Sequence, residues 1–140
     1  MHKETMAKNK SSKPERQLTV GELEIMEAVW QQGEATVRDV LQSLPNDRKL
    51  AYTSVATVMK ILEQKGFLKS SKSERTHTYQ ALIARNEYEG QTLRHITNKL
   101  FRGSPSSLVM RLLDESDASE EELKSLRQLL DERLENSRWK

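Results

Sequence analysis

The stretch AYTSVATVMKILEQKG, residues 51–66, places hydroxyl and amine side chains at the spacing of one helix face. The candidate functional residues on this face are Thr53, Ser54, Thr57 and Lys60. A hydroxyl can donate or accept a hydrogen bond at a base edge, a threonine methyl can touch a thymine methyl, and a lysine can reach a guanine or a phosphate. Because threonine and serine are poor helix formers, their gathering on one exposed face predicts a surface that reads DNA.

The opposite face of the same stretch is apolar and predicts attachment to a hydrophobic core. Its residues recur at i, i+3, i+4 and i+7, and they are Val55, Val58, Met59 and Leu62. Thr53 is the expected N-cap of this helix, and Gly66 is expected to end it. The sequence therefore predicts a helix with one buried face and one slim, polar face.

A basic hairpin is predicted directly after this helix. The segment FLKSSKSERTHTYQAL suits two short strands around the turn SKSER. Its candidate phosphate contacts are Lys69, Ser71, Lys72, Arg75 and Thr76. Contacts to phosphates contribute affinity and positioning rather than sequence specificity. The hairpin would therefore complement the helix predicted within residues 51–66, the reading helix.

Two earlier helices are predicted by their capping signals. Thr19 with Glu22 and Thr36 with Asp39 each form a capping box before an apolar stripe, and EAT between the two helices suits a very short strand. The expected order is helix, short strand, helix, helix, hairpin. That order is typical of a winged helix-turn-helix, in which the third helix enters the major groove.

Residues 84–136 predict a set of amphipathic helices that cannot enclose a core alone. The apolar positions expected at a dimer interface are Leu93, Ile96, Leu100, Phe101, Leu108, Val109, Leu112, Leu123, Leu126 and Leu130. The same element of a second subunit is the simplest partner surface for these stripes, although packing within one chain is the alternative. The predicted fold is mainly α with a small β-hairpin: a polar, disordered tail at 1–16, a winged-helix domain at 17–83 and a helical dimerisation domain at 84–136.

Composition narrows the function further. Residues 48–80 hold seven Lys/Arg and two Asp/Glu, whereas residues 114–135 hold nine Asp/Glu and three Lys/Arg, so only the first part suits nucleic acid. The 140-residue chain has no cysteine, and His2, His77 and His95 lack the spacing of a metal site. No apolar run suits a membrane span and the N-terminus lacks a secretory pattern, so a cytoplasmic protein is expected. Without a phosphate loop, nucleophile elbow or catalytic carboxylate pair, we expect no enzyme and no cofactor.

Four stretches together resemble the penicillinase-repressor family: LTVGELEIMEAVWQQGEATVRDVLQSL, AYTSVATVMKILEQKGFL, THTYQAL and LFRGSPSSLVMRLL. The family includes beta-lactamase and methicillin-resistance repressors and a copper-responsive branch, and the resemblance runs from about Leu18 to Leu130. It implies a dimeric repressor that binds a palindromic operator through a winged-helix domain. By position it implies DNA contacts from Thr53, Ser54, Thr57 and Lys60, from Arg75 and its neighbours, and from Tyr52 near the backbone.

This chain departs from the family pattern in two places. Copper-responsive members carry a C-terminal cysteine cluster, which is missing here. In the beta-lactamase branch a membrane sensor protease triggers cleavage at an Asn-Phe bond near the segment aligned with KLFRGSP, but Asn98 and Phe101 are separated in this chain. A sensor protease is therefore only a hypothetical partner. Release by a small ligand, and a winged-helix protein–protein adaptor that does not bind specific DNA, are the alternatives.

Overall fold

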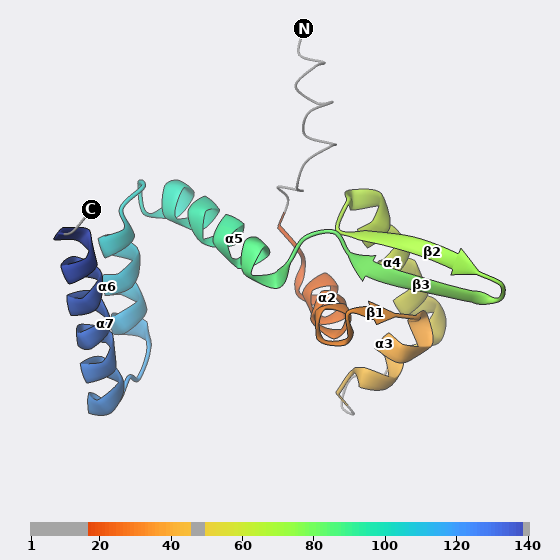
Figure 1. Cartoon of the computed structure of the whole chain (residues 1–140), viewed down its shortest axis with the longest axis horizontal. Helices are drawn as coiled ribbons and strands as arrows, with labels where there is room; N and C mark the ends of the chain where they lie inside the picture. The colour runs from red at the N-terminus through yellow and green to blue at the C-terminus, as the bar shows by residue number, and fades with distance from the viewer. Residues whose placement is uncertain (1–16, 46–49, 139–140) are drawn as a thin grey trace, which may run out of the picture. The chain divides into compact units, whose positions relative to one another are not determined.

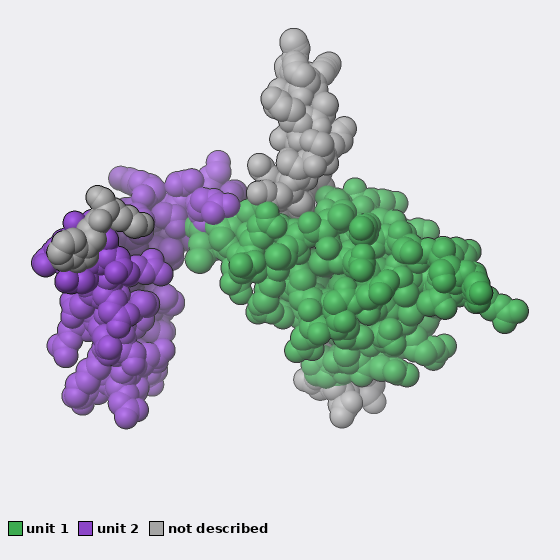
Figure 2. Space-filling view, viewed as in Figure 1, with its two compact units in different colours: residues 1–93 green, residues 94–140 purple. Residues whose placement is uncertain are grey.

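The computed structural model describes residues 17–45 and 50–138. It divides the chain into two compact units, one up to Leu93 and one from Arg94 onward (Figure 2). The division falls within a helix, later in the chain than the boundary expected at residue 84. The predicted disordered tail at 1–16 lies outside the described residues.

Within residues 17–45 and 50–93, the first unit contains helices and a small antiparallel sheet (Figure 1). Its elements are α2 (Val20–Gln32), β1 (Glu34–Ala35), α3 (Val37–Ser43), α4 (Tyr52–Lys65), β2 (Leu68–Ser73) and β3 (Thr76–Ala81), followed by the beginning of α5 (Arg85–Leu100). The strand order is β1-β3-β2, so β3 is the central strand. The predicted hairpin and the short strand at Glu34–Ala35 are confirmed, but the turn is shorter than the expected SKSER. Strand β2 runs to Ser73 and pairs there with Thr76, so only Glu74 and Arg75 form the turn.

Local capping chemistry begins the first two helices as predicted. The Thr19 hydroxyl accepts from the backbone N–H of Glu22 at 3.1 Å, and the Glu22 carboxylate accepts from the Thr19 N–H at 2.9 Å. Thr36 and Asp39 form the same reciprocal pair at 3.0 Å in both directions. Each pair satisfies two backbone donors that a helix start would otherwise leave unpaired.

The predicted start of α4 at Thr53 is wrong. The helix begins at Tyr52 after Ala51, which offers no side-chain cap, and the Val55 N–H donates to the Ala51 carbonyl at 3.1 Å. Thr53 therefore lies in the first turn. Starting at Tyr52 gives the helix the backbone hydrogen bond from Val55 to Ala51, and this start does without a side-chain cap, which contributes about 1 kcal/mol. Gly66 ends the helix at φ 92° and ψ 12°, as predicted.

One hydrophobic core holds the first unit together. Its largest fully buried side chains come from α2, α3, α4, the hairpin and the segment before α5: Phe67, Ile25, Met26, Met59, Leu62, Leu68, Ile83, Val29, Val40 and Val55. Val58, which was expected on the buried face, is only partly buried at its edge. The core thus fixes one face of α4 and leaves the other exposed.

The second unit contains the rest of α5, α6 (Pro105–Glu115) and α7 (Glu120–Arg138), and the chain reverses direction between α6 and α7 (Figure 1). Ser104 and Ser119 cap the last two helices by accepting from Ser107 N–H and Glu122 N–H, each at 3.1 Å. No residue described in α6 or α7 is fully buried. The apolar stripes of these helices therefore lack a complete core within one chain.

Candidate nucleic-acid interface

The exposed face of α4 carries the residues predicted to read DNA. Thr53, Thr57, Lys60 and Gln64 are exposed at a helical spacing that places them in one stripe, and Ser54 is exposed beside them. Val55, Met59 and Leu62 on the other side are fully buried. The structure therefore brings the four predicted reading residues together on one narrow face.

Two further residues at this surface were missed from the sequence. Ile61 is 38% exposed and follows Lys60 on the outer side of α4, where an apolar side chain can meet a thymine methyl. Arg38 of α3 places its guanidinium 5.8 Å from the centre of the exposed Tyr52 ring. An arginine on a short helix carries no local signal that it meets Tyr52.

The hairpin distributes its predicted phosphate contacts over two faces. Cross-strand partners share a face, and Lys72 pairs with His77 whereas Lys69 pairs with Gln80. By the same alternation Ser71 lies with Lys69, and Lys72 lies with Ser70. Thr76 pairs with Ser73 on the Lys69 face, and Arg75 lies in the turn. The predicted phosphate contacts of the hairpin therefore do not share one surface.

The face that carries Lys72 is the one attached to the reading helix. Ser70 shares this face, and its hydroxyl donates to the Glu63 carboxylate of α4 at 2.6 Å. This contact ties β2 to α4 and sets the distance between the reading helix and the hairpin. Lys72 therefore lies on the hairpin face that packs against α4, and Lys69 lies on the other face.

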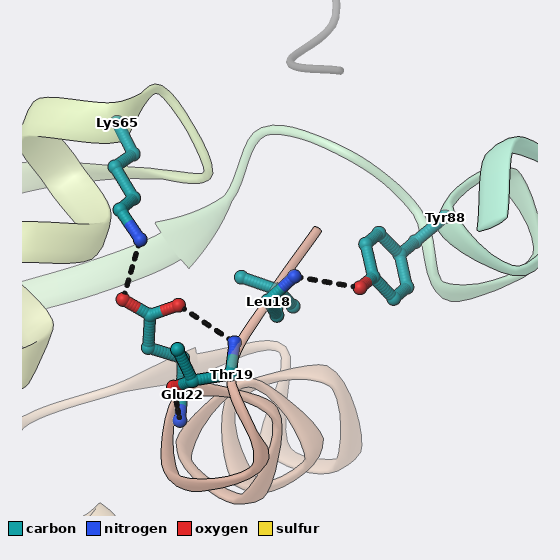
Figure 3. Close-up of polar contacts among 5 residues, drawn as sticks. All are labelled: Leu18, Thr19, Glu22, Lys65 and Tyr88. Atoms are coloured by element: carbon teal, nitrogen blue, oxygen red, sulfur yellow. Dashed lines mark hydrogen bonds and ion pairs between the residues drawn. The ribbon is translucent and has the colours of Figure 1, made fainter. Parts of the chain in front are cut away.

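An ion pair joins the end of the reading helix to the start of α2. Lys65 Nζ lies 2.7 Å from Glu22 Oε2, and the other oxygen of that carboxylate accepts from Thr19 N–H (Figure 3). Burial raises the pKa of the Glu22 carboxyl, but the hydrogen bonds from Lys65 and Thr19 and the charge of Lys65 outweigh burial and lower it. Glu22 therefore stays ionised and holds both helices.

A second contact anchors α5 to the same corner. The Tyr88 hydroxyl of α5 accepts from the Leu18 backbone N–H at 2.9 Å, directly before the Thr19 cap (Figure 3). The Trp30 indole N–H of α2 donates to the Ile83 carbonyl at 2.9 Å, just ahead of α5. Contacts distant in sequence thus position α2, α4 and the first turns of α5 as one body.

Comparison with known proteins identifies the family. The family model described as "Penicillinase repressor" matches residues 18–132. The chain belongs to the penicillinase repressor family. It is 23% identical over 117 residues to the methicillin resistance regulatory protein MecI of Mammaliicoccus sciuri, covering 84% of this chain and 95% of that protein. It is 26% identical over 116 residues to the penicillinase repressor of Bacillus licheniformis, covering 83% and 91%.

Penicillinase repressors are non-enzymatic transcriptional regulators with a winged-helix DNA-binding fold, so the predicted fold class and the absence of enzyme activity are confirmed. Among solved structures, the adhesin competence repressor (AdcR) of Streptococcus pyogenes matches with a TM-score of 0.42 and 18% identity, covering 95% of this chain and 90% of that one.

Among the described residues, no group of His, Asp or Glu could hold a metal ion. None of the helices in this part of the chain has the length and hydrophobicity of a membrane span.

Proposed function

We propose that this penicillinase repressor family member binds a palindromic operator as a homodimer and represses transcription from it in the cytoplasm. The observation that supports base reading is the polar stripe of α4, where Thr53, Thr57 and Lys60 are exposed on a helix whose other face packs against the core. Slim hydroxyl side chains allow the helix to approach base edges, and Lys72 adds a cation on the attached face of the hairpin.

The exposed leucines of the second unit support the dimer. Leu130 is 66% exposed and Met110 is 65% exposed, and the stripe of α7 repeats at Leu123, Leu126, Leu130 and Leu134. Each leucine buried between two chains would contribute about 1.5–3 kcal/mol, which outweighs the repulsion between solvated acidic residues. In a dimer, two reading helices would meet half-sites roughly 34–36 Å apart.

A selected operator tests DNA recognition. Duplexes enriched from a random library by the full chain should bind at least about a thousandfold more tightly than shuffled duplexes of equal composition. Affinity for both should fall steeply as salt is raised from about 50 to 200 mM, since bound lysines and arginines release counterions. Absence of enrichment together with absence of salt-dependent binding would favour a protein–protein adaptor instead.

Sedimentation of a matched pair of variants tests the dimer. Leu130→Glu places a charge in the proposed interface and should shift the chain to monomer, with loss of tight binding to the full palindrome. Val20→Glu changes a side chain that is 81% exposed in the first unit and should leave the dimer intact. A dimer that persists in Leu130→Glu at micromolar concentration would contradict this interface.

Proteolytic release is a hypothesis that the family raises for this chain. Asn98 lies in the last turn of α5, and Phe101 follows the end of that helix. The two residues are not adjacent, so the Asn-Phe bond is not reproduced here. If a sensor protease releases the repressor, immunoblots during induction should show a shortened chain, and an intact repressor throughout induction would refute it.

A further inference from the structure

A groove between α2 and the first turns of α5 takes no part in the proposed interface with DNA. Its cavity volume is about 330 Å³, which lies within the range of small-molecule sites. The walls are almost wholly apolar and come mainly from Leu23 and Trp30 of α2 and from Tyr88 and Leu93 of α5. None of the lining residues belongs to the reading helix or to the hairpin.

Two aromatic walls of this groove are held in place before any ligand arrives. The indole N–H of Trp30 donates to the Ile83 carbonyl, and the Tyr88 hydroxyl accepts from Leu18 N–H. The centres of the Trp30 and Tyr88 rings lie 6.0 Å apart with 38° between their planes. Fixed aromatic walls lower the entropic cost of binding and favour a flat aromatic guest.

Thr92 supplies an unused hydrogen-bonding group in the wall. Its Oγ1 is shielded from solvent and has no hydrogen-bond partner within the described part of the chain. A shielded hydroxyl without a partner is uncommon, because it forfeits the bonds it would make to water. Thr92 lines the groove, and threonine has two accessible χ1 rotamers in a helix, so rotation about χ1 is the movement by which this hydroxyl would meet a guest.

The charges at the mouth of the groove disfavour an anionic guest. The Arg85 guanidinium lies 5.8 Å from the centre of the Trp30 ring and is already paired with the carboxylates of Glu27 and Glu89. Two carboxylates around one guanidinium leave a net negative mouth. A carboxylate ligand would have to displace one of them to reach Arg85.

We propose that this groove binds a small aromatic molecule that carries one hydrogen-bonding group and no negative charge. The aromatic part lies against Trp30 and Tyr88, and the polar group bonds to the Thr92 hydroxyl. The site goes beyond operator binding. Because its walls come from α2 and α5, an occupant would fasten α5 to the helix that also anchors Lys65 of α4 through Glu22.

Nuclear magnetic resonance of the full chain tests the site. In a Trp139→Phe background Trp30 is the only tryptophan, so a single indole N–H signal reports the groove. Benzamide should shift this signal saturably, with a dissociation constant on the order of 1 mM for so small a probe. Benzoate, its anionic analogue, should bind at least about tenfold more weakly.

A matched set of variants assigns the contact. Thr92→Val keeps the shape of the side chain and should weaken benzamide by about three- to tenfold, the effect of one lost hydrogen bond. It should leave the binding of fluorobenzene unchanged, and Thr53→Val on the reading helix should leave both probes unchanged.

Three kinds of result would overturn the proposal. The first is the absence of a saturable shift with benzamide up to about 10 mM, a concentration well above the dissociation constant expected for a preformed apolar site. The second is equal binding of benzoate or an unchanged benzamide affinity in Thr92→Val. The third is a Trp30 signal that moves with protein concentration alone, which would assign the groove to contact with a second copy of the chain.

Discussion

The ion pair between Glu22 and Lys65 gives a quantitative prediction about the anchoring of the reading helix. Lys65→Met keeps the length of the aliphatic stem but removes the charge that neutralises the Glu22 carboxylate. The side chain of Lys65 is 22% exposed and that of Glu22 is 10% exposed, so the pair is neither fully buried nor free in solvent. The substitution should therefore destabilise the first unit through a carboxylate left without its partner.

The expected loss in free energy of unfolding lies between the values for a fully buried and an exposed ion pair. Breaking a fully buried pair costs about 3–5 kcal/mol and breaking an exposed one costs at most about 1 kcal/mol. We expect Lys65→Met to lower the free energy of unfolding by about 2 kcal/mol. In a double-mutant cycle with Glu22→Gln, which preserves the capping geometry, about 1–2 kcal/mol of this should be coupling between the two side chains.

Urea denaturation followed by Trp30 fluorescence in a Trp139→Phe background measures this coupling in the first unit. The matched control is the pair of Lys124 with Glu120 in α7, which is 3.5 Å long and 61% and 85% exposed. Replacing Lys124 with methionine should change the free energy of unfolding by no more than about 0.5 kcal/mol, and this control is followed by far-ultraviolet circular dichroism because Lys124 lies outside the unit that Trp30 reports.

The pH dependence of the coupling follows from the lowered pKa of Glu22. A carboxyl whose pKa is lower in the folded state contributes stability that is fully present above its unfolded pKa, about 4.3. That stability is lost as the pH falls through the folded pKa. The coupling should therefore be constant from pH 6 to 8 and vanish in strong acid. A coupling below about 0.3 kcal/mol at pH 7, or one that does not decline at all as the pH falls below about 4.3, would refute the argument.

Three further predictions concern the interface and its support. Thr57→Ala should relax the preference for particular bases by about 1–3 kcal/mol, measured on single-base variants of a selected operator, and equal losses on specific and shuffled duplexes would exclude base reading. Lys72→Ala should reduce the slope of log affinity against log salt by about one, whereas Lys69→Ala on the other hairpin face should reduce it less, and equal slopes would contradict the two-face assignment. Tyr88→Phe removes the acceptor for Leu18 N–H and should cost about 1 kcal/mol in urea denaturation, and an unchanged midpoint would show that water replaces this bond.

The boundaries of several elements follow from neighbouring residues alone. Thr19 with Glu22 and Thr36 with Asp39 are three residues apart, so the chain can form these capping boxes as soon as each helix begins. Gly66 ends α4 because the required left-handed conformation is intrinsically accessible to glycine. The start of α4 differs from the expected one at Thr53 because the helix begins at Tyr52 after Ala51, which offers no side-chain cap and therefore carries no local signal in the sequence.

The sequence by itself determined the class of the fold, the polar and apolar faces of α4 and the amphipathic stripes of α6 and α7, because periodicity along a helix assigns each residue to a face. Only the tertiary structure decided which donors act together. Packing turned the Lys72 face of the hairpin toward α4, where Ser70 meets Glu63, and packing of α3 brought Arg38 to Tyr52. The contacts of Glu22 with Lys65 and of Leu18 with Tyr88 span 43 and 70 residues. Contacts over such distances depend on how the whole unit packs, and no local pattern of side chains specifies them.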